Sequence, residues 1–389
     1  MKHCRILTVL GMLSLGAAVC GAAGSTPPPS KEKPWLVYIG TFTNAKGKGI
    51  YCSRLDRATG SLQPSVLAAE TRSPSFLALN PNGSVLYAVH EIGDFAGHAG
   101  AISAFAIDKA DGRLKLLNQQ STCGPGPCHL ALDRRGQCII AANYSGGSVA
   151  CLPIRAGGRL GPATCFVQHA GSSINRQRQE GPHAHCVTLE AGDHFAFVAD
   201  LGLDKILAYR LDAAQGKLTA NQPASTLLAA GSGPRHFVFH PNGRYAYAIN
   251  ELASTVVVFS YDAQRGALDT LQTISTLPPG FAGSNTTAEV AIHPSGKFLY
   301  GSNRGHDSIA IFAIDAAAGK LRSLGHEATQ GKTPRHFAID PSGRYLLAAN
   351  QDGNSVVVFR IDADSGRLQA TGSRIAVPSP VCIVVTPSD

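Results

Sequence analysis

Histidine, arginine and glutamate recur at equivalent points of a pattern that this 389-residue chain repeats. Arginine can bind an anion or a developing oxyanion, and histidine and glutamate can transfer protons. These residue types therefore favour acid–base chemistry on a small anionic molecule. The candidate site residues are His129, Asn143, His183, His185, Arg235, His236, Glu251, Glu289, Arg304, Arg335 and His336.

A repeated turn shows which elements must position these residues. Seven segments run from an apolar stretch through an acidic or polar turn to a glycine and then a leucine. A period near 50 residues with strand-type content is typical of radial β-repeats. The sequence therefore predicts an all-β fold, a seven-bladed β-propeller of four-stranded antiparallel blades. The repeated glycines, spaced by 46 to 58 residues, are Gly60, Gly112, Gly158, Gly216, Gly266, Gly319 and Gly366.

A second repeated phrase defines the first two strands of a blade, and it is clearest in residues 237–250 and 290–303. Each copy is an apolar strand, a Pro-x-Gly turn and a second, alternating strand. A third strand and the glycine turn into a fourth follow. The expected third strands include residues 255–261, 308–314 and 355–361.

The two ends of the repeat region complement each other. Residues 381–389 match only the first strand and turn of a blade, whereas residues 35–40 and 49–55 match the missing second and third strands. We therefore expect both ends to share the last blade, which closes the ring and removes a sheet edge. The alternative is an open or damaged eighth repeat with an unpaired C-terminal strand.

In such a fold, the start of strand one and the end of strand two should meet at one mouth of the central channel. Glu251, Glu289 and Arg304 occur once or twice at those registers, where packing alone requires no charge. Buried charges need partners, so we expect a polar cavity there. A structural role remains open for the strand-end asparagines, Asn143 among them, and for His236 and His336 in the repeated Pro-Arg-His.

The segment His183-Ala-His185 offers two imidazoles on one face of an extended chain. A zinc site would need a third ligand, which Glu289 or His129 could supply. Nearby arginines oppose a cation, so we expect no metal and favour acid–base use of His185. The preceding insertion, residues 172–180, is expected to form a rim over the channel.

The N-terminus reads as a secretory signal peptide over residues 1–24, followed by a flexible leader over 25–34 and a single propeller domain over 35–389. A basic start at Lys2 and Arg5 precedes a short apolar run. We therefore expect an exported protein, periplasmic or secreted, without a membrane span. A lipoprotein attached through Cys20 is the less favoured alternative, because Val19 is bulky for such a cleavage site.

Charge and cysteine content limit the partners. The formal net charge falls from +8 to +6 without Lys2 and Arg5, and no basic run accompanies it, so nucleic acid binding is not expected.

Cys123 and Cys128 could form a loop disulfide, and Cys138 and Cys151 are predicted on neighbouring strands. Buried free thiols are the equal alternative. Neither a nucleophile elbow nor a dinucleotide fingerprint occurs in the required context.

The chain resembles the seven-bladed propeller lactonases, a family that includes propeller-type 6-phosphogluconolactonases and carboxy-muconate cyclases. The resemblance covers residues 35–389 and rests on five motifs. It implies a site without metal or cofactor that acts on an anionic lactone, with His185, Arg235, Glu251 and Arg304 as the catalytic set. The motifs are Gly181-Pro-His-Ala-His185, residues 233–242 with their Pro-Arg-His, residues 247–251, Asn303-Arg304 and residues 333–337.

We therefore expect a monomeric lactonase that opens the ring of a sugar-acid lactone with water, with either Glu251 or His185 as the base. The other of these two would protonate the leaving alkoxide, while Arg235 and Arg304 would hold the substrate anion or the developing oxyanion. The remaining candidates would shape the pocket. Export is at odds with a phosphorylated substrate of the cytoplasm. The alternatives are a cyclase that forms a lactone and a non-catalytic exported propeller that binds a protein or a carbohydrate.

Overall fold

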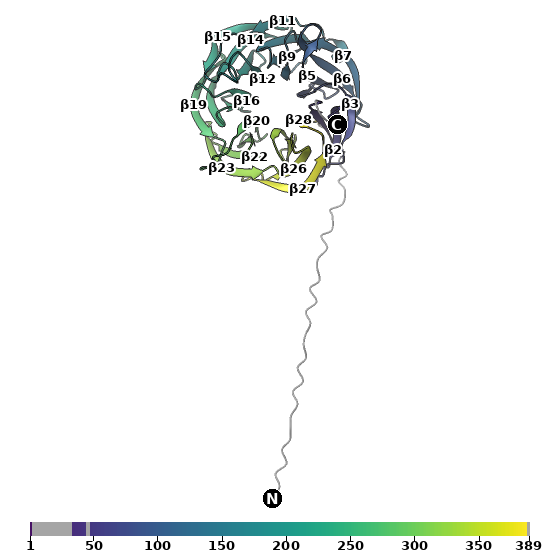
Figure 1. Ribbon diagram of the computed structural model, residues 1–389, viewed down its shortest axis with the longest axis vertical. Helices are drawn as coiled ribbons and strands as arrows, with labels where there is room; N and C mark the ends of the chain where they lie inside the picture. Colours follow the sequence, from purple (N-terminus) through teal and green to yellow (C-terminus); the bar gives the residue numbers. More distant parts are fainter. Residues whose placement is uncertain (2–32, 44–46, 387–389) are drawn as a thin grey trace.

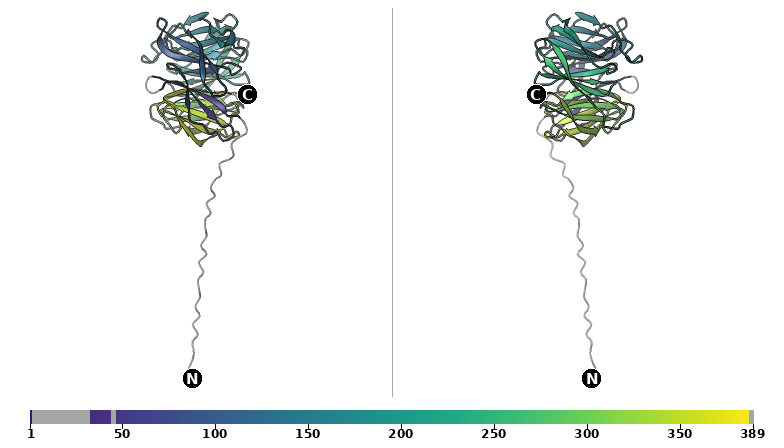
Figure 2. Two further views of the ribbon diagram at one scale, coloured as in Figure 1. Left: turned by 90° about the vertical axis from the view of Figure 1, so that its right-hand side faces the viewer. Right: turned by 90° about the vertical axis from the view of Figure 1, so that its left-hand side faces the viewer.

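The computed structural model describes Met1, residues 33–43 and residues 47–386. Within these residues, 28 strands form seven four-stranded antiparallel sheets. Figure 1 shows the sheets arranged in a ring, and Figure 2 shows that ring from two sides. The prediction of a seven-bladed β-propeller is confirmed. The expected signal peptide beyond Met1 lies outside the described residues, as does the leader up to residue 32.

Six sheets follow the chain in order, each beginning with the strand nearest the centre of the ring (Figure 1). The first two are β4 (Leu77–Leu79), β5 (Val85–Phe95), β6 (Ala99–Ile107) and β7 (Leu114–Ser121), then β8 (Pro127–Leu132), β9 (Cys138–Asn143), β10 (Ser148–Pro153) and β11 (Cys165–Gln168). The next two are β12 (Ala184–Leu189), β13 (Phe195–Asp200), β14 (Lys205–Asp212) and β15 (Lys217–Leu227), then β16 (Pro234–Phe239), β17 (Tyr245–Asn250), β18 (Thr255–Asp262) and β19 (Ala267–Ser275). The last two are β20 (Thr286–Ile292), β21 (Phe298–Arg304), β22 (Ser308–Ile314) and β23 (Leu321–Ala328), then β24 (Pro334–Ile339), β25 (Tyr345–Asn350), β26 (Ser355–Ile361) and β27 (Leu368–Ala376).

The seventh sheet closes the ring with both ends of the described chain. Its strand order is β28-β1-β2-β3, formed by β28 (Pro380–Val385), β1 (Trp35–Thr41), β2 (Gly49–Leu55) and β3 (Val66–Glu70). β1 pairs antiparallel with β28, so that Tyr38 lies opposite Val384. The expectation that the last blade contains both ends is confirmed. A single short 3₁₀ helix among the described residues, η1 (Ala156–Gly158), interrupts the strand pattern.

The repeated glycine is required by the turn and by the next blade. Gly266 ends the hairpin between β18 and β19 with a φ of +62°, and its N–H donates to the backbone oxygen of Asp262. A Cβ atom there would lie 2.5 Å from the ring of Phe195 in the preceding blade. Glycine satisfies both the left-handed backbone and this close approach. The repeat read from the sequence is therefore also a contact between blades.

Neighbouring blades share apolar cores and histidine hydrogen bonds. Between the fourth and fifth sheets, Tyr247 and Phe312 belong to one buried cluster. At the turns between strands one and two, His240 and His293 donate from Nε2 to the carbonyl oxygens of Gly296 and Gly343, each at 2.8 Å. These bonds give the two histidines a structural role between neighbouring blades.

All eight cysteines of the described residues are free thiols. Cys123 is exposed while Cys128 is buried, and Cys138 lies opposite Pro153 rather than Cys151 in the β9–β10 register. The structure therefore follows the free-thiol alternative and not the two disulfides considered from the sequence. Nowhere in the described chain is there a helix whose length and hydropathy would let it cross a bilayer.

Candidate active site

Glu251 is the centre of an arginine cluster at the inner end of the blades. It directly follows β17, which ends at Asn250. Its Oε1 lies 2.6 Å from Arg178 Nη2, and its Oε2 lies 3.0 Å from Arg235 Nε and 2.8 Å from Arg304 Nη2. Arg235 comes from the start of β16 and Arg304 from the end of β21. The expected meeting of strand-one starts and strand-two ends is thus observed for these residues.

The arginines decide the charge of Glu251. Burial alone would raise its pKa, since only 5% of the residue is exposed, but Arg304, Arg235 and Arg178 outweigh burial and hold the pKa at about 2. The carboxylate is therefore ionised at neutral pH. Burial and the neighbouring Arg304 and Arg335 lower the pKa of Arg235 to about 9, which still leaves it protonated.

A cavity of about 300 Å³ opens beside this cluster. The volume is at the lower end of the range for small-molecule sites, and the charged walls suit a polar ligand better than an apolar one. The lining residues are Glu91, Cys128, Tyr144, Arg178, His185, Glu251, Thr286, Arg304 and Arg335.

His185 is a buried, neutral imidazole on the wall of this cavity. It lies in β12, and its Nδ1 is 3.7 Å from the Cys128 sulfur. Burial lowers the pKa of His185 well below its usual 6.5, and the charges of Arg235 and His236 lower it further. An unprotonated imidazole at neutral pH can accept a proton from water.

His183 occupies the rim rather than the cavity wall. Its ring stacks on Tyr144 with a centroid distance of 4.6 Å, while His185 meets the edge of the same tyrosine at 5.4 Å. His183 Nε2 lies 3.3 Å from Glu180 Oε1. The two alternating histidines therefore flank one tyrosine, but only His185 faces the cavity.

Positive charge exceeds negative charge around the cavity. The side chains of Arg178, Arg304 and Arg335 line it with Glu91 and Glu251, and Arg235 adds a further guanidinium behind Glu251. The buried atoms Arg304 Nε and Glu91 Oε2 have no hydrogen-bond partner. Buried charged atoms without partners are uncommon in native proteins, and both residues line the cavity.

A second carboxylate, Glu289, lies one step further along the inner strands, in β20. Its Oε2 is 3.0 Å from His236 Nδ1 and 3.1 Å from His336 Nε2. Burial raises the pKa of Glu289, and burial lowers the pKa of His336 to about 4 and that of His236 well below 6.5. Burial therefore outweighs pairing in this cluster, which favours the neutral forms.

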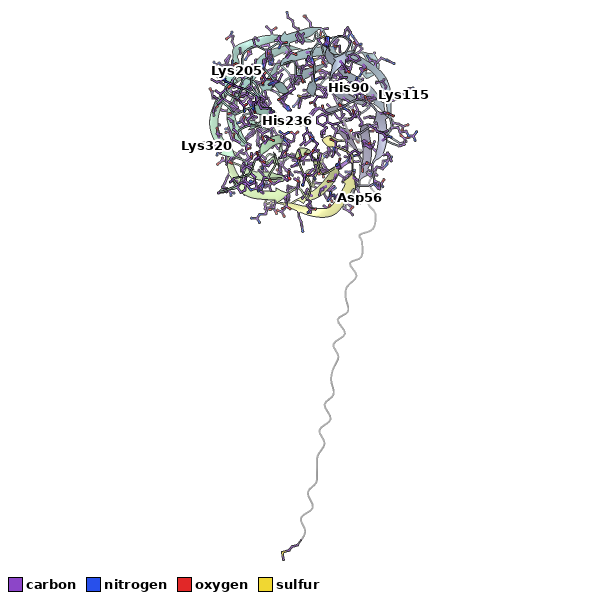
Figure 3. All side chains as sticks on the ribbon, in the orientation of Figure 1. Asp56, His90, Lys115, Lys205, His236 and Lys320 are labelled. Atoms are coloured by element: carbon purple, nitrogen blue, oxygen red, sulfur yellow. The ribbon has the colours of Figure 1, made fainter. Side chains whose placement is uncertain are left out.

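Aromatic rings complete this deeper layer. Phe76 stacks on His129 with a centroid distance of 3.9 Å, and His129 meets the edge of the His236 ring at 5.2 Å. Phe76 also contacts His336 at 5.9 Å. His236 lies near the centre of the ring in Figure 3, while Lys115, Lys205 and Lys320 lie at its periphery.

The deeper layer borders a second cavity of about 320 Å³. His129, His236 and Glu289 form one end of it, and the far ends of the same inner strands form the rest, for example at Leu132 and Val238. The first cavity has none of these five residues in its wall. The predicted site residues are therefore divided between two layers, which corrects the expectation of a single pocket.

The expectation that Asn143 lines the substrate pocket also changes with the structure. Asn143 reaches neither cavity, because its buried amide donates to the Thr122 carbonyl oxygen at 3.2 Å and to Ser148 Oγ at 3.1 Å. It links its own blade to the segment that follows β7 of the preceding blade, which is the structural role left open for it. In the part of the chain that the structure describes, no three His, Cys, Asp or Glu side chains are arranged to hold a metal ion.

The sequence left five cavity residues, Thr286 among them, out of the candidate set. Glu91 and Tyr144 occupy the same register as Glu251 and Arg304, and Cys128 occupies the register of His185, so the alignment of blades contained the signal for these three. Arg178 belongs to the insertion at residues 172–180 and has no equivalent in other blades. Only its position before the His183-Ala-His185 motif pointed to the channel.

A family described as seven-bladed β-propeller lactonases has a model that matches residues 36–385 of this chain. Two curated relatives carry the name 6-phosphogluconolactonase. The one from Bacillus subtilis is 35% identical over 349 residues, which cover 90% of this chain and 97% of the relative. The one from Formosa agariphila is 37% identical over 305 residues, which cover 77% of this chain and 85% of the relative.

A solved structure matches the whole ring. The periplasmic gluconolactonase of Pseudomonas aeruginosa superimposes with a TM-score of 0.86 at 34% identity, covering 91% of this chain and 99% of that chain. The match therefore includes all seven blades and the strands that close the ring. The names of these proteins differ in whether the lactone carries a phosphate.

Proposed function

Because this chain belongs to the family of seven-bladed β-propeller lactonases, we propose that it hydrolyses the ring ester of a sugar-acid lactone. The family relationship makes it an enzyme, and the substrate proposal is supported by relatives named for 6-phosphogluconolactone and gluconolactone. The observation that carries the proposal is one cavity, which His185 lines together with Glu251 and its partners Arg178 and Arg304.

In the proposed reaction, His185 takes a proton from water as the water oxygen bonds to the lactone carbonyl carbon. The carbonyl oxygen becomes an oxyanion, which Arg304 can stabilise through its unpaired Nε–H. The ring C–O bond then breaks, and the imidazolium of His185 returns its proton to the departing ring oxygen. The products are the carboxylic acid and a hydroxyl group of the same molecule, with no metal or cofactor in any step.

Glu251 has a different part in this scheme. With a pKa of about 2 it carries no proton at neutral pH, so it cannot protonate the leaving oxygen. Its contacts instead hold Arg235 and Arg304 in place and offset part of their charge. Glu251 as the base that activates water is the alternative, and a Glu251→Gln variant with full hydrolysis would remove both assignments.

The location of the enzyme is a further part of the proposal. The basic start and apolar run of residues 1–24 have the pattern of a secretory signal, and the matching Pseudomonas protein is described as periplasmic. We propose export to the periplasm or beyond, acting as a monomer. Cleavage after residue 24, seen by mass spectrometry of the mature protein, is the expected result.

The function is tested by following acid release from a panel of phosphorylated and unphosphorylated aldonolactones, relative to the spontaneous rate. Wild-type protein should accelerate hydrolysis, and Arg304→Ala should lower kcat by about 10²- to 10³-fold, because an oxyanion donor is lost. Arg322→Ala, an exposed arginine on β23, is the matched control and should have wild-type rates. A folded protein that accelerates none of the panel would overturn hydrolysis and favour lactone formation or a binding role.

A further inference from the structure

Arg178 differs from the other arginines on Glu251 in where it comes from and how far it is exposed. Arg235 and Arg304 belong to strands, and their side chains are 3% and 12% exposed. Arg178 belongs to the loop at residues 172–180 between β11 and β12, and its side chain is 38% exposed. It reaches across the cavity from the rim, where it also donates to Tyr144 Oη at 3.2 Å.

The backbone of this loop is firmly anchored. Gln179 is fully buried, accepts a hydrogen bond from Asn175 N at 3.1 Å and donates to the carbonyl oxygen of Leu201 at 2.9 Å. Ser173 Oγ donates to Asp204 Oδ2 at 2.6 Å. The loop therefore presents the Arg178 side chain from a fixed point, while the partly exposed guanidinium keeps access to both solvent and cavity.

The contacts of Glu251 make Arg178 the exchangeable partner. Arg178 is the contact of Oε1, whereas Arg235 and Arg304 both contact Oε2. Loss of the Arg178 contact would leave Glu251 with two buried guanidinium partners, so it would not be stranded as an unpaired charge. An incoming anion can thus compete for Arg178 at a lower cost than for either strand arginine.

We propose that Arg178 is the residue that selects substrates by charge: it leaves Glu251 to bind the phosphate or carboxylate of an anionic lactone, and a neutral lactone does not draw it away. This rests on the proposed lactonase function. The guanidinium offers a planar fork that suits phosphate or carboxylate oxygens. Arg335, on the same cavity wall, adds charge that favours the anion's entry.

The exchange also changes the charge balance around Glu251. With Arg178 bound to substrate, Glu251 loses one of the charges that depress its pKa. A rise in the pKa of Glu251 should appear as a shift of the acid limb of the pH–rate profile. A charged substrate should therefore show that limb at higher pH than a neutral substrate, and Arg178→Ala should abolish the difference between them.

The test compares kcat/KM for 6-phosphoglucono-δ-lactone and glucono-δ-lactone in the wild type, Arg178→Ala and Arg178→Lys. Loss of one charge-assisted hydrogen bond should lower kcat/KM for the phosphorylated lactone by about 10- to 100-fold, with less than about a twofold change for the neutral one. Arg178→Lys should restore part of the preference. Arg176→Ala, an exposed arginine of the same loop, is the control and should keep the wild-type ratio.

An unchanged ratio in a folded Arg178→Ala variant would overturn the assignment while leaving the lactonase function intact. If the wild type hydrolyses neither lactone, calorimetric measurement of 6-phosphogluconate binding tests whether Arg178 binds an anion, because this measurement does not require turnover. Binding by the wild type that is weakened at least about tenfold in Arg178→Ala, but not in Arg176→Ala, supports the anion site. Equal binding by all three proteins, or no binding by the wild type, overturns it.

Discussion

Glu251 and Glu289 lie on successive blades with 5% and 7% of their surfaces exposed, yet their surroundings shift their pKa values in opposite directions. Three arginines hold the pKa of Glu251 at about 2 in spite of burial. The two histidines beside Glu289 lie just as close, but burial prevails there and raises the pKa of the carboxyl. The same side chain thus has a lowered pKa in one layer and a raised pKa in the next.

The difference lies in what each partner does when it is buried. A guanidinium keeps its proton over the whole physiological range, so Glu251 always faces positive charge. An imidazole gives up its proton when water is removed, and burial lowers the pKa of His336 to about 4. Partner chemistry, more than distance, therefore decides whether the pKa of a buried carboxyl is lowered or raised.

The largest expected effect separates the histidines of the two layers. His185→Asn should lower kcat by about 10²- to 10⁴-fold, because the cavity would lose its proton acceptor. His336→Asn should lower kcat by less than about tenfold, since that ring contacts Glu289 and lies outside the cavity wall. Single-turnover hydrolysis by both folded variants is the measurement. Equal losses would show that the two layers act as one catalytic unit.

The next effect concerns stability. Glu251→Gln leaves three guanidinium groups without their anion and should lower the free energy of unfolding by about 3–5 kcal/mol at pH 7, as when one partner of a buried ion pair is removed. Glu289→Gln removes a charge that burial already disfavours and should lower this free energy by less than about 1 kcal/mol. Urea unfolding of both variants measures the contrast. Similar losses in the two variants would contradict the opposite pKa shifts of the two carboxyls.

The smallest effect is the pH dependence of the same unfolding free energy. The folded pKa of Glu251 is below its unfolded value, so its stabilisation is present above pH 4.5 and is lost as the pH falls towards 2. The folded pKa of Glu289 is above its unfolded value, so its contribution is lost as the pH rises beyond 4.5. Glu251→Gln should flatten the acid side of the profile, and Glu289→Gln should make the protein relatively more stable on the neutral side.

Much of the fold could be predicted from the sequence because each blade obeys the same local rules. Gly266 shows why: its turn and its approach to Phe195 both exclude a side chain, so the residue recurs in register. The last blade could be predicted in the same way. Residues 35–40 and 49–55 match the second and third strands of a blade that has no first strand, and residues 381–389 match that first strand.

The site was predicted less completely, for two physical reasons. Neighbouring residues such as Arg235 and His236 differ by one step in an alignment, but that step of about 3.3 Å moves a side chain from the arginine cluster to the layer of Glu289. Arg178 lies in an insertion, where no other blade offers a register. The contact of Arg178 with Glu251 depends on the path of this loop over the channel. The hydrogen bonds of Gln179 fix that path, and local sequence patterns do not encode it.

The pairing of β1 with β28 has a consequence for biosynthesis. These strands are neighbours in the finished ring but stand at opposite ends of the described chain. At roughly 5 to 20 residues per second, a ribosome would deliver β28 some 15 to 70 seconds after β1. During that interval the apolar strand Trp35–Thr41, fully buried in the ring, has no inner partner and is an exposed edge open to wrong pairing. The inner edge of the first strand therefore stays open to wrong pairing until the last strand of the ring arrives.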